Sequence, residues 1–245
     1  MMKLLDIEYA AFISCPAIDQ SLQAGMLLRS NGGYTKRANS ATAICDVTGN
    51  YRKVIQACEA YFEDRGQPSV FRLLSILDID EFDTKLADRG YQSIEKTLVM
   101  SCPLPGISRQ RSKINSLSGD DWIDAFYQIS GDKSQYKRQH LEMLLHIKSP
   151  CLTAAVRDAT GAIAALGIGV VENGYFGIFN IVTAKNQQRK GYSTILISEL
   201  MSWANSTRAH TAYVQVRAEN NPAVELYKKL GYQENYHYWY RVTGE

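Results

Sequence analysis

A short segment of this 245-residue chain has the residue types of an anion-binding loop. Gln188–Thr194 reads QRKGYST and falls between a predicted strand and a predicted helix. Backbone N–H groups at the start of a helix lack partners within the helix and carry a partial positive charge. Gly191 lets a phosphate approach the backbone closely, and Lys185 adds to the positive potential of the loop. The segment predicts a phosphate-bearing ligand, although it matches neither the G-x-x-x-x-G-K-S/T phosphate loop nor the G-x-G-x-x-G dinucleotide turn.

A second segment, Asn220–Tyr232, carries a tyrosine that could move a proton. Asn221 followed by a proline is typical of a helix start, and Gly231 is typical of a helix end. Tyr227 falls on the apolar stripe of this helix, so periodicity alone predicts a packed aromatic residue. Asn220 alone is typical of a turn. Taken by itself, this segment is therefore compatible with a purely structural role.

Together the two segments are more specific, because they resemble two motifs of the GNAT superfamily of acetyltransferases in the same order. QRKGYS resembles the Q/R-x-x-G-x-G/A signature, with Ser193 where glycine or alanine is usual. The second segment, NNPAVELYKKLGY, resembles the family's N-x-x-A-x-x-L-Y-x-x-x-G-F/Y segment. The resemblance covers residues 150–243. It implies the GNAT fold and an N-acetyltransferase that uses acetyl-CoA as co-substrate.

The resemblance also implies roles for individual residues. An amine would attack the thioester directly, and Tyr227 would protonate the departing CoA thiolate. The carbonyl oxygen would need a hydrogen-bond donor as charge develops on it. A thiol is acidic enough for a tyrosine to return its proton without large pKa tuning. The cofactor would be held by the end of one strand, by the loop and by the second motif, at Ile181, Val182, Thr183, Gln188, Arg189, Lys190, Gly191, Tyr192, Ser193, Thr194 and Asn220.

The base that takes the proton of the amine is not apparent from the sequence. Glu172 and Glu219 are the nearest carboxylates along the chain, and each has the context of an exposed surface acid. His140 and His146 are six residues apart on a predicted helix, do not share a face, and predict no metal site. A non-catalytic acyl-CoA-binding regulatory module is therefore the alternative function. The acceptor, a small-molecule or peptide amine, and the oligomeric state are left open.

The elements that position these segments follow an α/β order. A type I′ turn at Asn173-Gly174 joins two strands, and an apolar stripe from Ile197 to Ala204 predicts the helix after the loop. The other predicted elements of this half are strands at Cys151–Arg157, Ala162–Glu172, Tyr175–Thr183, Thr211–Arg217 and Gln233–Val242, and helices at Asp120–Ile129 and Ser134–Ile147.

The amino-terminal half repeats this order of elements. Its predicted elements are helices at Tyr51–Asp64 and Asp80–Asp88 and strands at Val70–Leu74 and Ser93–Met100. At an offset of 141 residues, Gly90 falls on Gly231 and Tyr51 falls on Tyr192. Repetition at this scale indicates two copies of one α/β unit. We therefore predict an α/β (α+β) protein of two tandem GNAT-like domains, with mixed central sheets flanked by helices.

The first copy is predicted to be degenerate. At the same offset, the loop glycine, the motif asparagine and the tyrosine correspond to Asn50, Ile79 and Leu86. Residues 1–105 are thus predicted to be a domain without a cofactor loop, and residues 110–245 the catalytic domain. Arg29–Ser40 predicts a hairpin that resembles a segment amino-terminal to the transferase domain in a subset of bacterial GNAT proteins. It could be a scaffold, or it could shape the substrate cleft.

The amino-acid composition limits the classes of protein to which the chain could belong. With a net charge of +2, 45% hydrophobic and 21% charged residues, the chain is typical of a globular protein that does not bind nucleic acid. The basic run at Arg109, Arg111 and Lys113 predicts a solvated linker at residues 103–112. No apolar run could span a bilayer, and the first residues lack the features of a signal peptide. Five scattered cysteines without a C-x-x-C pair predict reduced thiols in a cytoplasmic protein.

Overall fold

The computed structural model describes residues 2–104, 114–132 and 134–243, and its strands form one mixed sheet. The strands are β1 (Asp19–Gln23), β2 (Met26–Ser30), β3 (Ser40–Ala43), β4 (Val70–Leu74), β5 (Tyr91–Pro103), β6 (Asn115–Ser116), β7 (Cys151–Arg157), β8 (Ile163–Glu172), β9 (Tyr175–Thr183), β10 (Thr211–Arg217) and β11 (Gln233–Thr243). The helices are α1 (Met2–Ser14), α2 (Tyr51–Glu63), α3 (Asp80–Asp88), α4 (Gly119–Ser130), α5 (Lys137–His146), α6 (Tyr192–Ser206) and α7 (Asn221–Lys229).

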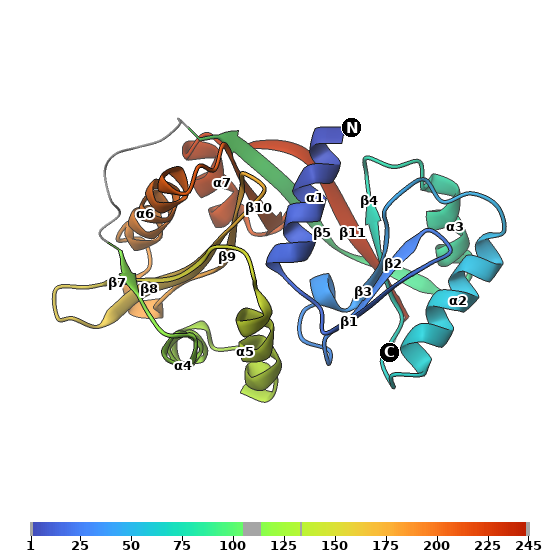
Figure 1. Cartoon of the computed structure of the whole chain (residues 1–245), viewed down its shortest axis with the longest axis horizontal. Helices are drawn as coiled ribbons and strands as arrows, with labels where there is room; N and C mark the ends of the chain where they lie inside the picture. The colour runs from blue at the N-terminus through green and yellow to red at the C-terminus, as the bar shows by residue number, and fades with distance from the viewer. Residues whose placement is uncertain (1, 105–113, 133, 244–245) are drawn as a thin grey trace.

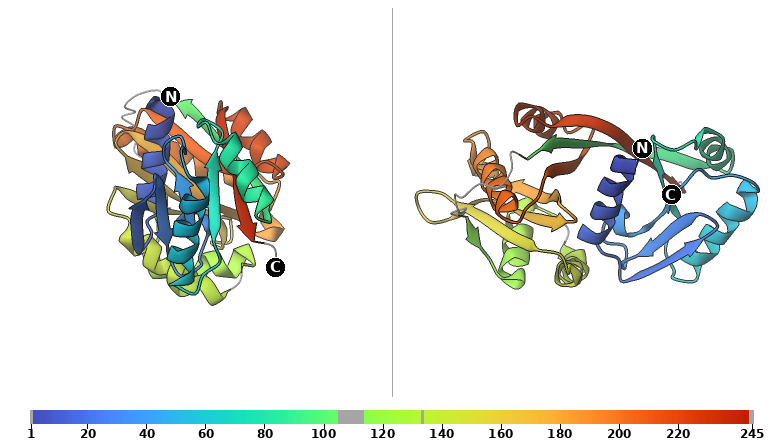
Figure 2. Two further views of the ribbon diagram at one scale, coloured as in Figure 1. Left: turned by 90° about the vertical axis from the view of Figure 1, so that its right-hand side faces the viewer. Right: turned by 45° about the horizontal axis from the view of Figure 1, so that its top comes forward.

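The sheet order is β1-β2-β3-β4-β11-β5-β10-β9-β8-β7-β6. Figure 1 shows two lobes, the amino-terminal lobe with β1–β4, α2 and α3 and the carboxy-terminal lobe with β7–β10 and α4–α6. The long strands β5 and β11 run side by side between the lobes along one side of the molecule (Figure 2). The predicted mixed α/β architecture with helices flanking the sheet is therefore confirmed.

The predicted repeat is visible in the element bounds. The 141-residue offset carries α3 (Asp80–Asp88) onto α7 (Asn221–Lys229) at both ends, and it carries the first residue of α2, Tyr51, onto Tyr192, the first residue of α6. The β8–β9 turn has positive φ angles at Asn173 (48°) and at the following glycine (80°), as a type I′ turn requires.

The two repeats exchange their last strands. In each lobe a parallel pair forms the middle of the sheet, β3 with β4 and β9 with β10. Each pair is then extended by the last strand of the other repeat, because β4 pairs with β11 and β10 pairs with β5. The sheet is consequently continuous, and separating the lobes would break its ladder. The division at residues 105–110 stays a prediction about where one repeat ends along the chain.

A helix that the sequence reading did not predict lies between the lobes. α1 packs against β8 and β9 of the carboxy-terminal lobe (Figure 1). It also carries Glu8, whose carboxylate accepts hydrogen bonds from Arg72 of β4 at 2.6 and 3.0 Å and from the hydroxyl of Tyr236 of β11. Glu8 and Arg72 are both buried, so this ion pair ties α1 to the amino-terminal lobe in a water-free environment.

The hairpin predicted at Arg29–Ser40 needs a correction. β2 and β3 do form an antiparallel pair, from Met26 opposite Ala43 to Arg29 opposite Ser40. The predicted segment is therefore mostly the connection, residues 31–39, which is longer than a hairpin turn and contains a 3-10 turn, η1 (Lys36–Ala38). Sequence periodicity missed this because the connection is held by side-chain hydrogen bonds rather than by a strand ladder.

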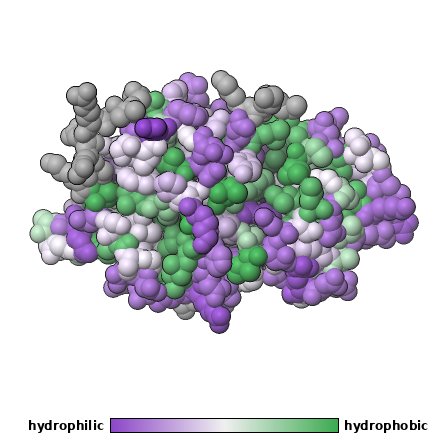
Figure 3. Space-filling view, viewed as in Figure 1, coloured by the Kyte–Doolittle hydropathy of each residue, from purple (hydrophilic) through white to green (hydrophobic). Residues whose placement is uncertain are grey.

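Three further sequence predictions concern the linker, the cysteines and membrane-spanning segments. Residues 105–112 of the predicted linker, with the basic run Arg109, Arg111 and Lys113, lie outside the described residues. All five cysteines are free thiols, and three of them are buried. Among the described residues, no helix combines the length and apolar character needed to cross a membrane. Figure 3 shows polar and apolar residues interspersed over one face of the molecule.

Candidate active site

The strands β9 and β10 pair over only part of their length. Their parallel register ends where Val214 lies opposite Ile178, while β9 continues to Thr183 and β10 to Arg217. At this split lies a cavity of about 1100 Å³, here called the main cavity. It is lined by the ends of both strands, by the loop before α6, by the first turns of α6 and α7, and by Arg37. The edge of β9 along the cavity has backbone groups without a neighbouring strand, and they are free to bind a ligand.

The start of α6 is open and has no side-chain cap. Gly191 is the N-cap residue, with φ 86° in the left-handed region, and it makes no side-chain cap. A β-carbon at Gly191 would meet nothing within 4 Å, so the backbone there faces open space. The amides of residues 192–194 have no partner within the helix and point toward the cavity end of α6.

Two other helices, α2 and α7, each begin at an asparagine whose side chain caps the helix. Asn50 accepts a hydrogen bond from the amide of Lys53 at the start of α2, and Asn220 accepts one from the amide of Ala223 at the start of α7. Gly191 occupies the position that corresponds to Asn50. The amino-terminal repeat thus satisfies the start of α2 internally, whereas the carboxy-terminal repeat leaves the start of α6 without a side-chain cap.

The charge of the lining suits a polyanion. Among the described lining residues, the cations are Arg37, Arg189, Arg217 and Lys229, and the only carboxylate is Glu225. Ten of the predicted cofactor residues line the main cavity: Ile181, Val182, Thr183, Gln188, Arg189, Gly191, Tyr192, Ser193, Thr194 and Asn220. The eleventh, Lys190, is exposed outside it and donates a hydrogen bond to Gln187 at 3.1 Å.

A β-bulge interrupts β9 at the cavity. Its register with β8 changes between Val182 opposite Leu166 and Phe179 opposite Ile168, so Asn180 and Ile181 share one partner residue. Asn180 has a φ of 51°, which is uncommon for a residue other than glycine.

The neighbouring elements support this bulge. The carbonyl of Gly167, opposite the bulge, accepts a hydrogen bond from the buried indole of Trp122 in α4 at 3.2 Å. A β-carbon on Gly167 would overlap Cδ1 of Ile181, so a larger residue there would displace the end of that side chain. The bulge therefore turns backbone and side-chain groups of Asn180 out of the regular ladder at the wall of the cavity.

A buried histidine holds the side chain of Asn180. Nε2 of His140, on α5, lies 2.8 Å from the Asn180 amide nitrogen, and the His140 ring stacks on Tyr34 with 4.4 Å between ring centroids. Burial lowers the pKa of the His140 imidazole to about 4, so the ring is neutral at physiological pH. A neutral Nε2 without its proton can accept from the Asn180 amide. His140 is fully buried and acts on the cavity through Asn180.

Tyr227 faces the same cavity from α7. It is buried, with 5% of its surface exposed, and its ring meets Tyr232 edge-on at 5.4 Å between centroids. Its hydroxyl has no hydrogen-bond partner among the described residues. Burial raises the pKa of the Tyr227 phenol above its ordinary value, so the phenol keeps its proton. Tyr227 is therefore packed, as its periodicity predicts, and it also lines the main cavity, while its role as the acid stays a prediction.

The two carboxylates considered as bases lie elsewhere. Glu172 is at the far end of β8 and accepts a hydrogen bond from Ser149 at 2.5 Å. Glu219 is largely exposed, 3.6 Å from Arg217. Neither is among the described lining residues of the main cavity. Within the described part of the chain, no cluster of three or more histidine, cysteine or acidic side chains could bind a metal ion.

Sequence reasoning missed Asn180, His140 and Arg37. Asn180 interrupts a β-branched strand, which is a weak signal of a bulge. Arg37 belongs to the other repeat, and nothing local in the sequence indicates that it reaches this cavity. The residues that correspond to the site in the first repeat, Ile79 and Leu86, are buried core residues, in agreement with a degenerate copy.

Comparisons with known proteins match nearly the whole chain. A family model described as "Probable histone acetyltransferase Rv0428c C-terminal" matches residues 3–241. The "Uncharacterized N-acetyltransferase YobR" of Bacillus subtilis is 31% identical over 244 residues, covering 96% of this chain and 97% of that protein. Among solved structures, the GCN5-related N-acetyltransferase from Kribbella flavida has a TM-score of 0.71 at 11% identity and covers 99% of this chain and 95% of its own.

A further solved structure has a comparable architecture. The tandem GNAT protein from the clavulanic acid biosynthesis pathway has a TM-score of 0.58 at 14% identity, covering 78% of this chain and 70% of its own. The fold and the split sheet are those of a GNAT-type acyltransferase. The chain belongs to the GNAT superfamily of N-acetyltransferases.

Proposed function

We propose that this protein transfers the acetyl group of acetyl-CoA to a primary amine in the main cavity. The observation that carries the proposal is the uncapped start of α6 at Gly191 beside the unpaired edge of β9. The free amides and Arg189 suit a pyrophosphate, and the edge of β9 from Ile181 to Thr183 suits the amide-rich pantetheine arm. A bound acetyl-CoA would then have its thioester near the bulge at Asn180.

At the bulge, the reaction needs an amine placed against the thioester carbon, a donor for the carbonyl oxygen and a proton for the leaving sulfur. The amine nitrogen forms a bond to the thioester carbon, and the carbon–sulfur bond breaks. Negative charge that develops on the carbonyl oxygen is stabilised by a backbone amide of the bulge, where Asn180 and Ile181 leave the regular ladder. The sulfur leaves as a thiolate and takes the proton of Tyr227, which the phenol retains at neutral pH because burial raises its pKa.

The attacking amine loses a proton to solvent, and Tyr227 regains its proton from solvent after the thiol has formed. Of the described residues that line the main cavity, Glu225 is the only carboxylate, and it is exposed and paired with Lys228 at 3.0 Å. Its place on the outer part of α7 leaves it unsuited to act at Asn180. Water in the open cavity is therefore the carrier, and turnover should rise with pH as more of the amine is neutral.

The test combines turnover with binding. Purified protein is incubated with acetyl-CoA and a panel of primary amines, and free thiol is followed with a colorimetric reagent. An amine-dependent release of thiol supports the proposal. If acetyl-CoA raises the melting temperature but no amine releases thiol, the binding-module alternative is correct. If acetyl-CoA changes neither quantity, the cofactor does not bind in this cavity.

A further inference from the structure

Arg37 reaches the main cavity from the other repeat. It lies in η1 of the β2–β3 connection, whereas the other described lining residues belong to the carboxy-terminal lobe. It also lines a second, much smaller cavity of about 20 Å³, here called the side cavity, together with Phe179 and Asn180. Arg37 therefore stands where the two cavities meet, next to the bulge.

The guanidinium of Arg37 has no partner within the described chain. Its side chain makes no hydrogen bond or ion pair, whereas its neighbour Lys36 pairs with Glu95 at 2.8 Å. Burial acts most strongly on the charge of Arg37, followed by the nearby phenol of Tyr238 and thiol of Cys15, and neither of these groups is a carboxylate. A half-buried guanidinium without an anion is costly unless a ligand supplies one.

The connection that carries Arg37 is built to hold it in place. The carbonyl of Arg37 accepts a hydrogen bond at 2.8 Å from Arg29, which also donates to the carbonyls of Phe12 and Cys15 at the end of α1. The guanidinium of Arg29 thus donates its hydrogen bonds to backbone carbonyls. The arrangement fixes the backbone of Arg37 and leaves its side chain free to bind.

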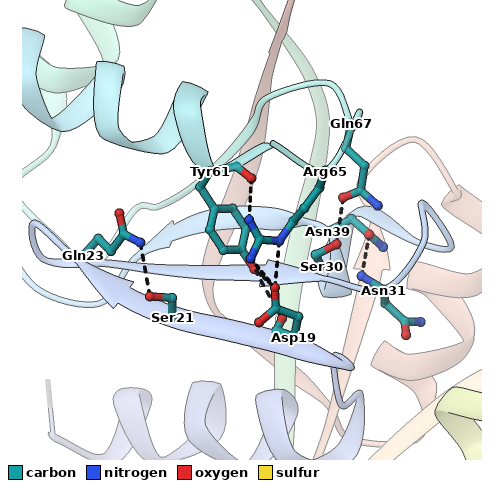
Figure 4. Close-up of polar contacts among 9 residues, drawn as sticks. All are labelled: Asp19, Ser21, Gln23, Ser30, Asn31, Asn39, Tyr61, Arg65 and Gln67. Atoms are coloured by element: carbon teal, nitrogen blue, oxygen red, sulfur yellow. Dashed lines mark hydrogen bonds and ion pairs between the residues drawn. The ribbon is translucent and has the colours of Figure 1, made fainter. Parts of the chain in front are cut away.

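Asn39 organises the rest of the connection. Its side-chain oxygen accepts hydrogen bonds from the amides of Asn31 and Gly33 at 2.7 and 3.0 Å, and its amide donates to the carbonyls of Tyr34 and Thr35. Figure 4 shows the contact between Asn39 and Asn31, beside the hydrogen bond that joins β2 to the segment after α2.

Thr35 has the unusual backbone angles φ 55° and ψ 127°. For a β-branched residue these angles are strained, and such strain persists where the surrounding contacts enforce it, often at functional sites. The strained residue stands two positions before Arg37, in a connection that is held by the hydrogen bonds of the Asn39 side chain. This indicates that the strained conformation of Thr35 is maintained because it places the side chain of Arg37.

The position of Arg37 corresponds to the acceptor end of the cavity. The anion loop lies beyond the end of β9 at Thr183, and three residues of extended strand, about 10 Å, separate Thr183 from Asn180. Arg37 and Asn180 line both cavities, whereas the anion loop lines only the main cavity, so Arg37 belongs to the end of the main cavity at the bulge.

We propose that Arg37 binds a carboxylate of the acceptor, so that the substrate is an amine that also carries a carboxylate, such as an α-amino acid. This inference rests on the proposed function and names its acceptor class. A guanidinium binds a carboxylate through two parallel N–H donors, which fixes the orientation of the attached amine. The amine nitrogen then lies beside Asn180 and the bulge, where it can attack the thioester carbon.

The charges favour a carboxylate over two other acceptors. A phosphate carries nearly two negative charges, and Arg37 is the only described cation where the two cavities meet. A lysine-rich peptide would bring further positive charges toward Arg37, which opposes binding. A single carboxylate matches the single guanidinium.

The experiment compares acids with their amides. The twenty common amino acids and their carboxamides are tested in pairs, both for thiol release from acetyl-CoA and for a rise in melting temperature of the CoA-loaded protein. A phosphate-bearing amine, phosphoethanolamine, and a lysine-rich peptide are included. Arg37→Met removes the charge, Arg37→Lys retains it without the planar fork, and Lys36→Met is the matched control that removes a neighbouring charge outside the cavity.

The expected result is an acid preferred over its amide by about 10- to 100-fold in kcat/KM, the worth of a charged hydrogen bond. Arg37→Met abolishes this preference mainly through KM, Arg37→Lys recovers part of it, and Lys36→Met leaves it intact.

Other results separate the two hypotheses. Equal use of acids and amides, or an acid preference that survives in Arg37→Met, overturns the inference while the acetyl transfer stands. A stronger response to the phosphate amine or the peptide overturns it in the same way. If acids raise the melting temperature in an Arg37-dependent manner but no thiol is released, the carboxylate site stands and the proposed acetyl transfer fails.

Discussion

Replacing Tyr227 by phenylalanine separates its two possible roles. The substitution removes one oxygen and leaves the ring, so the packing against Tyr232 is retained. The hydroxyl has no hydrogen-bond partner among the described residues, so its loss leaves no buried group unpaired. We therefore expect the free energy of unfolding to change by less than about 0.5 kcal/mol, since the larger penalties come from abandoned partners.

The effect on turnover should be much larger. General acids contribute on the order of 10²–10⁴ in rate, and the good thiolate leaving group places this case at the lower end. We expect kcat to fall by about 30- to 100-fold with little change in KM for acetyl-CoA. Because burial raises the pKa of Tyr227, the wild-type rate should show no loss from its ionisation below pH 10.

Tyr232→Phe is the matched control. It makes the same change in a buried tyrosine whose ring contacts Tyr227 but which does not line the main cavity. Steady-state thiol release and thermal unfolding are measured for both variants. A Tyr227→Phe enzyme with wild-type kcat, or an equal loss in Tyr232→Phe, would refute the assignment of Tyr227 as the acid.

Three further predictions concern the cofactor loop, the buried histidine and the buried ion pair. Gly191→Ala and Gly90→Ala introduce similar strain at φ 86° and 89°, so both should lower the melting temperature by roughly 2–4 °C, while only Gly191→Ala reduces the rise caused by acetyl-CoA. His140 is neutral when folded, with a pKa of about 4, and protonates near pH 6.5 when unfolded; stability should therefore fall by about 3 kcal/mol as the pH drops from 6.5 to 4, and His140→Gln should flatten this part of the denaturation profile. Glu8→Ala leaves Arg72 buried without its anion and should cost about 3–5 kcal/mol in chemical denaturation, and Glu8→Leu combined with Arg72→Met should recover most of it.

Local patterns in the sequence were sufficient for most elements. Gly90 and Gly231 end equivalent helices, and Asn173-Gly174 forms the turn that its residue types require. The helix after the loop begins where the sequence predicts it, and the structure adds that Gly191 has a left-handed conformation. These features depend on residues within one or two turns of each other, so their signals survive in a single sequence.

The features that could not be predicted depend on distant partners. α1 has an apolar composition without a clear stripe, and its place is set by Glu8 meeting Arg72, 64 residues away. The exchange of β5 and β11 follows from which strand each lobe leaves unpaired, and the two strands occupy corresponding positions in the two repeats. Arg37 enters the cavity only because that exchange and α1 bring the two lobes together.

The starts of α2 and α6 show how one repeat could lose a site while gaining stability. Both helices need acceptors for their first amides, and the two repeats meet this need differently at corresponding positions. Asn50 supplies an acceptor from its own side chain, which stabilises the helix at all times. Gly191 supplies none, so under the proposed function the first amides of α6 gain that stabilisation when the cofactor binds. Under the same proposal the amino-terminal repeat binds no cofactor, and its contribution to the main cavity is Arg37.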